Sequence, residues 1–596
     1  MRALRGALSR ARIAVGAALL LIAVAGLYLR FRHNGYGLPF VYNYDEATHF
    51  TNRAVTMFGQ DFDPGYYQNP SGFTYLCYLA LRFVYGLLGV HLDHGTVIRQ
   101  FAVDDTPIFE LSRGLAALLA MAGAGVVFWV GRRVWGTAVG VVAAALLTFA
   151  FLPVTYSRIA VTDVGTFIPV ALSVWGALRV HERGRRRDYL LAGAAAGLAV
   201  GFKYTAGLVI LPTLVAGGLR LWREPGPLLR RESLRHLVLA GVALVVVFAI
   251  TTPYFFVHPV TALYQIKNQA NAAGGTAKLG QSQEGGFVYY LKSFTWGFGW
   301  AAIVAAVAGA VLELRRDRLR GAMLAVFPIA LYLYMGAQSR YFGRWMLPMY
   351  PVLALLAGVA IVWVARRVRA GVAVQVAIGA LVLAGVLVQP LAADIRTDRV
   401  IGREDTRQVL RDYLVAHYPR ALRVVIEPAV PDSYYDIPGD LVRRKQFIRG
   451  FIRDIRRQAG ADAPEGTNST YANTLRPALI DDYRRTGFCL VATMSVIRGR
   501  AQNAALPEAL AYYRRLEAES TQILDLRPYK PGRKAVPLHY DFSYDYYPTA
   551  YYRPGPEVRL YRLKDCAQRY GRVPIFPLGM RGLDKGAGTS YFTHPH

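Results

Sequence analysis

Charged residues are scarce in this chain: only 18% of its 596 residues are Asp, Glu, Lys or Arg, whereas 54% are hydrophobic. In soluble globular domains about a quarter of the residues are charged. This composition argues against an ordinary soluble enzyme. It favours a protein that crosses a membrane several times.

Cysteine is also rare, with Cys77, Cys489 and Cys566 as the only three. None of them forms a CxxC pair, so a metal site built from thiolates is not expected. If the C-terminal part of the chain is exported, Cys489 and Cys566 can form a disulfide there. Two free buried thiols are an equally good interpretation.

Acidic residues are few, 39 against 69 Lys and Arg, which gives a formal net charge of +30. Such a surplus is also typical of nucleic-acid-binding proteins. Here, however, the arginines occur in short clusters between long apolar runs. We therefore expect no nucleic-acid partner and interpret the clusters as a sign of membrane topology.

The apolar residues form eleven candidate membrane spans. They lie near residues 13–29, 111–131, 137–155, 161–179, 189–202, 204–219, 236–257, 294–313, 321–336, 345–364 and 371–391. The first span follows a basic flank and so also resembles a signal peptide. Because "RFRHNGYG" after it lacks a small-residue cleavage site, we interpret it as a retained signal-anchor.

The arginine clusters predict how the spans are oriented. If the N-terminus is cytoplasmic, every short Arg-rich connection falls on the cytoplasmic side, as the positive-inside rule requires. Counting residues 72–89 as a twelfth span would reverse all later loops. We therefore expect this segment, with Arg82 in its middle, to lie along the membrane interface as an amphipathic helix.

After residue 391 the apolar runs shorten, and helix-like stretches alternate with strand-like ones such as "LRVVIE" and "EVRLYRL". The expected fold is a polytopic α-helical membrane protein with about eleven transmembrane helices and a C-terminal extracytoplasmic α/β domain. The membrane part comprises residues 1–391, with a first outer loop at 30–110. The α/β domain comprises residues 392–596.

Ionisable side chains gather at the predicted outer ends of the spans. They are Asp45 and Glu46 in the first outer loop, Arg158 and Asp163 after the third span, Lys203 between two short apolar runs, and Arg340, Tyr341 and Arg344 before the tenth span. Each has an ordinary interpretation as a solvated loop residue or an interfacial anchor. Together they combine carboxylates and cations at one lipid–water boundary, where ionisable groups are costly and often functional.

This combination fits the transfer of a sugar from a lipid phosphate. The reaction needs a base for the acceptor hydroxyl and positive charge to stabilise the departing phosphate. We take Asp45 as the candidate base, and Lys203 and the arginines as the candidate phosphate clamp.

The ordered motifs "YDEATHF", "NPSGFTYLCYLAL", "SRIAVTD", "GLAVGFKYTAG" and "SRYFGRWMLPMYP" resemble the C-type membrane glycosyltransferases. The branch they resemble includes the dolichyl-phosphate-mannose protein mannosyltransferases (glycosyltransferase family 39) and the lipid A aminoarabinose transferases. The resemblance runs from about residue 10 to 391. It implies an inverting glycosyltransferase in the cell membrane that takes its sugar from a polyprenyl phosphate. The acceptor would be a protein, a glycan or a lipid on the outer side.

The resemblance also assigns roles to individual residues. Asp45 matches the catalytic aspartate, with Glu46 beside it, and Asp163 matches a second acidic position. Lys203 matches a lysine that is common in this family. The Arg340–Tyr341 pair matches an "RYLLP"-like motif at the active-site face.

One departure from the family concerns a metal. Gln68 and Asn69 stand where the family often has histidine or charged residues, so a metal-binding contact is replaced there. The sequence therefore predicts no definite cofactor, and it leaves open whether a divalent metal binds. His258 is a weak candidate ligand, because a lone histidine at a membrane boundary is more often structural.

Two other function classes compete with this prediction. A transporter or flippase of lipid-linked sugars would concentrate its polar residues near the bilayer midplane, often in two related halves. Here the polar residues lie at outer helix ends, without an apparent repeat. A binding protein anchored by its spans is the third option, but eleven spans are excessive for an anchor.

Overall fold

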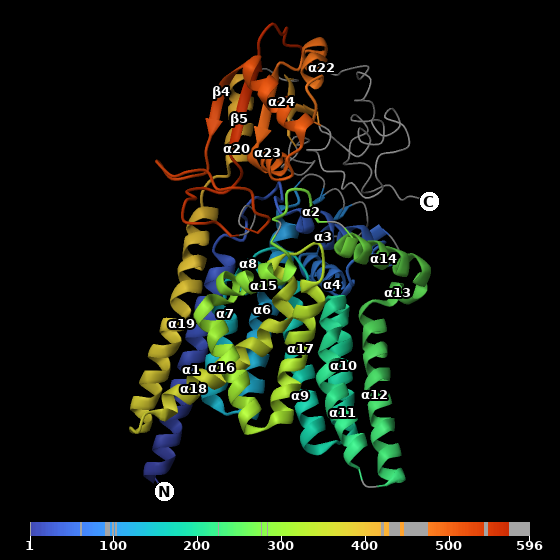
Figure 1. Cartoon of the computed structure of the whole chain (residues 1–596), viewed down its shortest axis with the longest axis vertical. Coiled ribbons are helices and arrows are strands. Elements are labelled where there is room, and N and C mark those ends of the chain that lie inside the picture. The colour runs from blue at the N-terminus through green and yellow to red at the C-terminus, as the bar shows by residue number, and fades with distance from the viewer. Residues whose placement is uncertain are drawn as a thin grey trace.

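The computed structural model describes residues 2–59, 62–89, 96–97, 100–101, 104–224, 226–275, 277–282, 284–418, 422–427, 442–445, 475–541 and 546–570. Their architecture is a bundle of long helices with a smaller mixed α/β unit at one end (Figure 1). Of the three hydrophobic clusters among the described residues, the largest lies inside the bundle and the next surrounds the sheet.

All eleven apolar stretches predicted from the sequence fall on helices. These are α1 (Arg2–Phe31), α6 (Thr106–Val134), α7 (Thr137–Phe149) with α8 (Phe151–Thr155), α9 (Phe167–Arg183), α10 (Arg186–Phe202), α11 (Leu211–Arg223), α12 (Pro227–Thr251), α16 (Trp300–Arg316), α17 (Arg318–Gly336), α18 (Tyr350–Arg367) and α19 (Val372–Ile401). Within the described part, nine helical segments are long and apolar enough to cross a membrane. The prediction counted two more because α7 and α10, at 13 and 17 residues, are shorter than the roughly 20 residues a bilayer needs.

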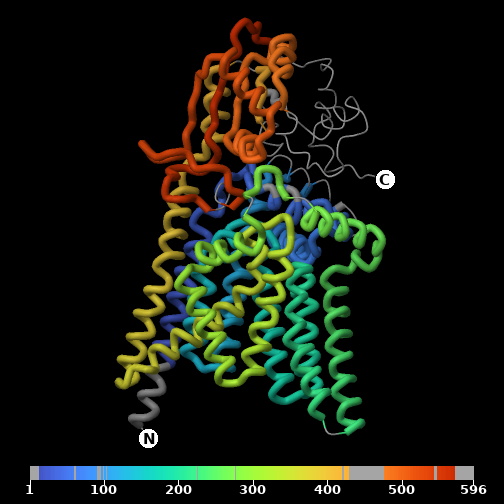
Figure 2. Tube along the Cα trace, viewed as in Figure 1, coloured from blue at the N-terminus to red at the C-terminus, as the bar shows by residue number. Residues whose placement is uncertain are grey.

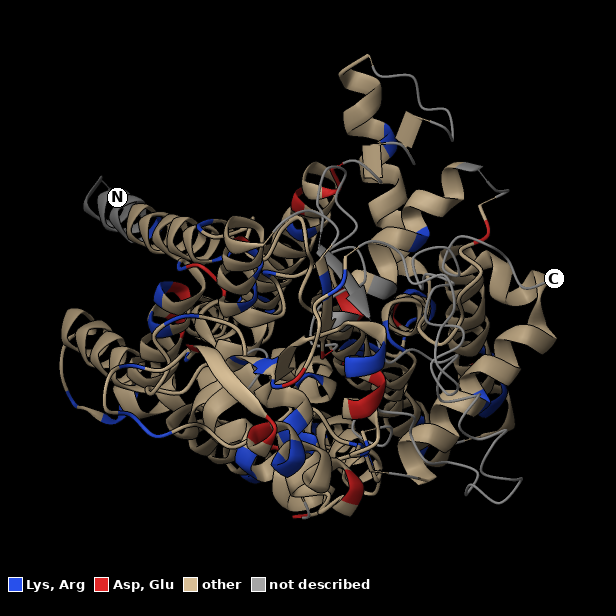
Figure 3. Cartoon of the chain, turned by 90° about the horizontal axis from the view of Figure 1, so that it is seen from above, with Lys and Arg blue, Asp and Glu red and all other residues tan. Residues whose placement is uncertain are grey.

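The helices run up and down between two ends of the bundle (Figure 2). The described N-terminal residues lie at the end opposite the α/β unit. The Arg-rich connections 183–187, 315–320 and 366–369 join helix ends there. Seen from the α/β end, most of the ribbon carries neither acidic nor basic residues (Figure 3). Large apolar side chains such as Leu20, Ile250 and Leu381 are exposed on the bundle, as expected for a surface in contact with lipid.

Several short helices of the described chain, at the end beside the α/β unit, do not belong to the spans. Helix α4 (Gly72–Leu87) is the segment predicted to lie along the interface, and it packs against α3 (Phe50–Thr56) and the end of α10. Helix α14 (Pro259–Gly275) lies across the same end, between α13 (Pro253–Val257) and α15 (Gly286–Phe294) (Figure 1). Between α15 and α16, residues Thr295–Gly299 form a π-helical turn.

The α/β unit contains a five-stranded mixed sheet. Its elements are α20 (Thr406–His417), β1 (Leu422–Ile426), β2 (Val442–Lys445), α22 (Leu479–Thr486), β3 (Leu490–Met494), α23 (Ser495–Asn503), α24 (Pro507–Ala518), β4 (Ser520–Leu526) and β5 (Val558–Leu563). The strand order is β2-β1-β3-β5-β4, in which β1 is parallel to both neighbours and β5 is antiparallel to both of its own. Every residue of β1 and β3 is buried, which is typical of central strands covered on both faces.

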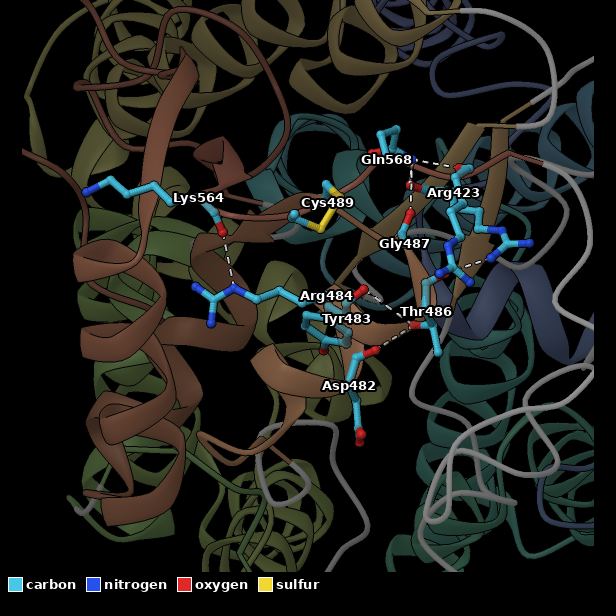
Figure 4. The surroundings of a disulfide bond; sticks show 11 residues. Arg423, Asp482, Tyr483, Arg484, Thr486, Gly487, Cys489, Lys564 and Gln568 are labelled. Atoms are coloured by element: carbon cyan, nitrogen blue, oxygen red, sulfur yellow. Dashed lines mark hydrogen bonds between the residues drawn. A yellow bond between two sulfur atoms is a disulfide. The ribbon is translucent and has the colours of Figure 1, made fainter.

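Cys489 and Cys566 form a disulfide at the edge of this unit, which decides between the two interpretations that the sequence left open (Figure 4). Cys489 precedes β3 and Cys566 follows β5, so the bond joins the ends of two paired strands that are 77 residues apart in sequence. Cys77 is a free, buried thiol in the bundle.

Replacing both Cys489 and Cys566 by Ser is expected to destabilise the α/β unit by about 2–5 kcal/mol, because a closed loop of this length restricts the unfolded chain. Hydrogen–deuterium exchange of β3 and β5 peptides measures the change, and a reducing agent should reproduce it in the wild type but add nothing in the variant. Equal protection of both strands in both proteins would contradict the prediction.

Candidate functional site

Asp45 lies in the short helix α2 (Tyr44–Thr48), at the end of the bundle that carries the α/β unit. The side chain of Asn43 caps this helix: its Oδ1 accepts hydrogen bonds from the Asp45 and Glu46 amides at 3.1 and 3.2 Å. The cap fixes the first turn, so the two neighbouring carboxylates point in different directions. Their surroundings consequently differ.

The Asp45 carboxylate forms an ion pair with Arg344, with Nη2 and Oδ2 2.5 Å apart. Its Oδ1 faces the His49 ring at 3.8 Å, and the Asp45 side chain keeps 30% of its surface exposed. The Arg344 guanidinium also lies over the Phe342 ring, 4.5 Å from its centroid. Residues 299 positions apart in sequence thus bring a partly accessible carboxylate and a cation together.

Two opposing effects act on the pKa of Asp45. Burial raises it, but Arg344 lowers it, with smaller contributions from His49, Lys278 and Lys203, and the net shift is downward. The carboxylate is therefore ionised at neutral pH.

Asp163 and Lys203 form a second ion pair beside the first. Asp163 begins the 3₁₀ helix η2 (Asp163–Thr166), and Lys203, in extended conformation, separates α10 from the 3₁₀ helix η3 (Tyr204–Ile210). The Lys203 ammonium also donates to the Arg344 carbonyl at 3.4 Å. Arg344 is itself the second residue of a 3₁₀ helix, η5 (Gly343–Met349), so three spans begin with tight turns that carry polar residues to one point.

Glu46 is fully buried and does not share the surroundings of Asp45. Arg113 of α6 donates two hydrogen bonds to the Glu46 carboxylate, of 2.7 and 2.9 Å, and the Ala160 amide donates to Oε1 at 2.8 Å. Arg113 in turn donates to the carbonyls of Asn34 and Tyr36. With its oxygens occupied in this way, Glu46 has the geometry of a structural anchor for α2.

The "SRYFGR" motif contributes at several points. Tyr341 is buried; its hydroxyl donates to the Ser282 carbonyl, and its ring packs on Tyr289 at 4.4 Å. The Arg340 amide donates to the Ala273 carbonyl at 2.9 Å, which ties the motif to the end of α14. Tyr341 and Arg340 thus hold the segment from which Arg344 extends.

Gln68 and Asn69 lie farther along the first outer loop, and His258 lies at the end of α13, directly before α14. Asn69 donates to the Tyr66 hydroxyl at 2.7 Å, and the Tyr66 ring stacks on His49, so Asn69 connects to Asp45 through two aromatic groups. His258 faces Asp63 at 3.5 Å instead of the Asp45 cluster. Among the described residues, the Gln68 side chain makes no hydrogen bond with Asp45, Asp163, Lys203 or Arg344. Within the described residues, no three His, Cys, Asp or Glu side chains are grouped so that they could hold a metal ion.

Arg158 is another predicted residue that lies outside the Asp45 cluster. Its Nε donates to the Leu29 carbonyl at 2.7 Å and its Nη2 faces Asp398 at 3.4 Å, so it joins α1 to α19. Arg158 is only five positions before Asp163 in sequence. The turn between the two residues nevertheless directs their side chains toward different helices.

Sequence reasoning missed three residues with roles at this site. Arg113 sits inside a long apolar helix, where a buried charge was a signal that could have been used. Lys278 contributes to the electrostatics of Asp45, and Asp541 of the α/β unit accepts a hydrogen bond from the Gly343 amide at 3.3 Å. Neither of these two lies in a pattern that distinguishes it from other loop residues.

Residues 110–252 match the family model described as dolichyl-phosphate-mannose-protein mannosyltransferase. This match confirms, over that segment, the resemblance that the sequence motifs carry. Over residues 110–252 the chain is thus similar to a family of membrane glycosyltransferases. Comparison with the curated proteins gives no match.

Among solved structures, the chain is similar to ArnT from Cupriavidus metallidurans bound to undecaprenyl phosphate, with 13% identity, a TM-score of 0.49, and coverage of 94% of this chain and 99% of that one. It is also similar to the oligosaccharyltransferase of Archaeoglobus fulgidus in its apo form, with 13% identity, a TM-score of 0.49, and coverage of 85% and 73%. The arabinofuranosyltransferase AftD from Mycobacteria has 16% identity and a TM-score of 0.42, with coverage of 92% of this chain and 40% of that one.

Replacing Arg113 by Met is expected to lower the stability of the bundle by about 3–5 kcal/mol, because it leaves the Glu46 charge buried without its partner. Thermal unfolding of the purified chain measures the loss. Arg82→Gln is the matched control, since Arg82 is exposed on α4 and surface changes usually stay within about 0.5 kcal/mol. Equal melting temperatures for the two variants would refute the anchoring role of the Glu46–Arg113 pair.

Proposed function

We propose that this chain is an inverting glycosyltransferase that moves a sugar from a polyprenyl-phosphate donor to an acceptor hydroxyl, with Asp45 as the base. The observation that carries the proposal is the Asp45–Arg344 pair: a partly exposed carboxylate beside a cation, at the end of an apolar bundle. The match of residues 110–252 to the mannosyltransferase family supports the same reaction class. The acceptor would be a protein, a glycan or a lipid.

At the anomeric carbon, the proposed step forms one bond and breaks one, and a proton moves from the acceptor to Asp45. The acceptor oxygen attacks the anomeric carbon on the face opposite the phosphate, the bond from that carbon to the phosphate oxygen breaks, and its electron pair leaves with the phosphate. The hydroxyl proton passes to Asp45, whose Oδ1 is the oxygen not engaged by Arg344. A carboxylate of low pKa is basic enough, because the acceptor oxygen becomes acidic as its new bond forms.

The cations would stabilise the phosphate that departs. Arg344 and Lys203 lie within one hydrogen-bonded cluster with Asp45 and Asp163. An arginine fork and a lysine ammonium are the groups that bind phosphate oxygens well in proteins. We take Asp163 as a residue that positions Lys203, since the two form an ion pair.

The proposed orientation puts the N-terminus in the cytoplasm and the site outside. The Arg-rich connections lie at the end opposite the site, as the positive-inside rule requires of cytoplasmic loops. The Cys489–Cys566 disulfide supports an oxidising compartment for the α/β unit. We propose a membrane domain of residues 1–391 and an extracytoplasmic domain of residues 392–596.

Asp45→Asn is expected to reduce sugar transfer by about 10²–10⁴-fold, because general-base assistance is lost while the shape is kept. The assay supplies a set of polyprenyl-phosphate sugars and a membrane extract as acceptor source. Lys267→Gln, at an exposed lysine of α14, serves as the control. Undiminished transfer by the Asn variant would remove Asp45 as the base, and no transfer by the wild type from any donor would remove the proposed function.

The pH profile of transfer tests the Asp45–Arg344 pair. Transfer requires ionised Asp45 and is lost as the pH falls through its pKa, which Arg344 lowers. In Arg344→Gln this pKa rises, so the acidic limb of kcat/KM should move to higher pH. An acidic limb at the same pH in both proteins would show that Asp45 does not control it.

A further inference from the structure

A short segment, residues 277–282, contacts both the bundle and the α/β unit. It connects α14 to α15 and brings Lys278 close to two aromatic rings: its Nζ lies 5.2 Å from the centroid of Phe342 and 5.9 Å from that of Tyr540. Phe342 belongs to the bundle and also carries Arg344 on its ring, whereas Tyr540 belongs to the α/β unit. Lys278 therefore lies between the two parts of the molecule.

The surroundings of Lys278 are rich in positive charge. Asp45 of α2 raises its pKa, but burial lowers it more, and Arg344, Arg500 and Arg340 lower it further, to about 8.

The ion pairs of the site leave this lysine uncompensated. Arg344 is paired with Asp45, and Lys203 with Asp163. In the described part of the chain, no carboxylate lies within 4.0 Å of the Lys278 ammonium. A half-buried cation without a counter-ion is costly, and an incoming anion would remove that cost.

The α/β unit fixes the loop from its outer side. The Tyr540 hydroxyl donates to the Leu279 carbonyl at 2.8 Å, and the Asn503 amide of α23 donates to the Gly280 carbonyl at 3.0 Å. Gly280 has φ +76°, and a Cβ there would lie 2.8 Å from the Cα of Arg500, so only glycine allows this close approach.

The bundle fixes the loop from below. Gln281 donates to the Ser339 carbonyl at 3.0 Å, and Tyr341 donates to the Ser282 carbonyl. Because the α/β unit and the bundle both bond to residues 279–282, the backbone that follows Lys278 is held in place. The side chain then has a defined position relative to Asp45.

We propose that Lys278 binds the phosphate of the lipid donor in the Asp45 site, and that the α/β unit positions it through Tyr540 and Asn503. This inference rests on the proposed function and adds a third cation to the phosphate clamp. It also gives the α/β unit a role in the reaction: Lys278 is the residue that contacts the donor, whereas Tyr540 and Asn503 act through the loop.

The test measures binding of undecaprenyl phosphate to the purified full-length chain, with inorganic phosphate as a competing ligand. Lys278→Gln should weaken lipid binding about tenfold, Lys278→Arg should keep it, and Lys267→Gln should leave it unchanged. Inorganic phosphate should compete with the lipid only weakly, because it lacks the polyprenyl chain. Competition at equal concentration would instead assign the lysine to free phosphate and overturn the lipid-donor assignment.

The pH dependence of binding separates contact from mere structural support. Wild-type affinity should fall as the pH rises through about 8, because Lys278 loses its proton there. The affinity of Lys278→Arg should stay constant over that range. Comparing the two proteins therefore separates the titration of Lys278 from any contribution of the neighbouring groups, which are Asp45, Arg340, Arg344, Arg500 and Tyr540. Tyr540→Phe should raise the KM for the donor more than it changes kcat and should alter the alkaline limb, with the melting temperature unchanged.

The outcomes distinguish this inference from the function on which it rests. If the wild type binds undecaprenyl phosphate and transfers sugar, but Lys278→Gln binds with wild-type affinity and pH dependence, only the role of Lys278 is overturned. If Lys278→Gln loses affinity and Tyr540→Phe leaves KM and the alkaline limb unaltered, the positioning role of the α/β unit is overturned. If the wild type binds no polyprenyl phosphate and transfers nothing, both the inference and the proposed function fail.

Discussion

The buried ion pair between Glu46 and Arg113 is the constraint on which the site depends. One carboxylate joins α2, α6 and the turn that ends at Asp163, because it accepts from Arg113 and from the Ala160 amide at once. Both charges lie in the interior, where each would be expensive alone. Because each charge compensates the other, the pair fixes α2 in a single orientation. In that orientation Asp45 faces Arg344.

The cost of charge at a lipid–water boundary explains why the other polar residues also come in pairs. Asp45 faces Arg344, Asp163 faces Lys203, and Arg158 faces Asp398 on the far side of the turn. Each pair joins segments that are distant in sequence, so the pairs also hold the outer ends of the helices together. The candidate site and the contacts that hold the helix ends together are therefore made from the same kind of ion pair.

The fold could be predicted from the sequence to a large extent because it depends on local, repetitive signals. Apolar length gives the spans, arginine position predicts which connections share one end of the bundle, and the shift to short strands after residue 391 gives the α/β unit. Those signals also place Asp45, Asp163, Lys203 and Arg344 on one side. They contain nothing about which of these side chains touch.

The limits of prediction at the site have physical reasons. Asp45 and Glu46 are adjacent in sequence, but a helix rotates about 100° per residue, so one faces the site and the other the core. Composition cannot show which of the two carboxylates faces the site and which faces the core. In sequence, Lys278 resembles the exposed Lys267, because both lie in segments of similar polarity. Only the contacts of the Lys278 ammonium with the Tyr540 and Phe342 rings distinguish the two lysines.

The division into a membrane domain and an outer domain, which stays a prediction, does not divide the chemistry. Phe40, five residues before Asp45, is buried in the core of the α/β unit, and the Arg407 guanidinium lies 3.6 Å from the centroid of the Tyr42 ring. The same unit binds the loop that carries Lys278. It therefore contacts the segments leading to the candidate base and to a candidate phosphate ligand, and a shift of the unit would change the distance between them. A C-terminal unit attached in this way is part of the frame that holds the candidate reacting groups at their spacing.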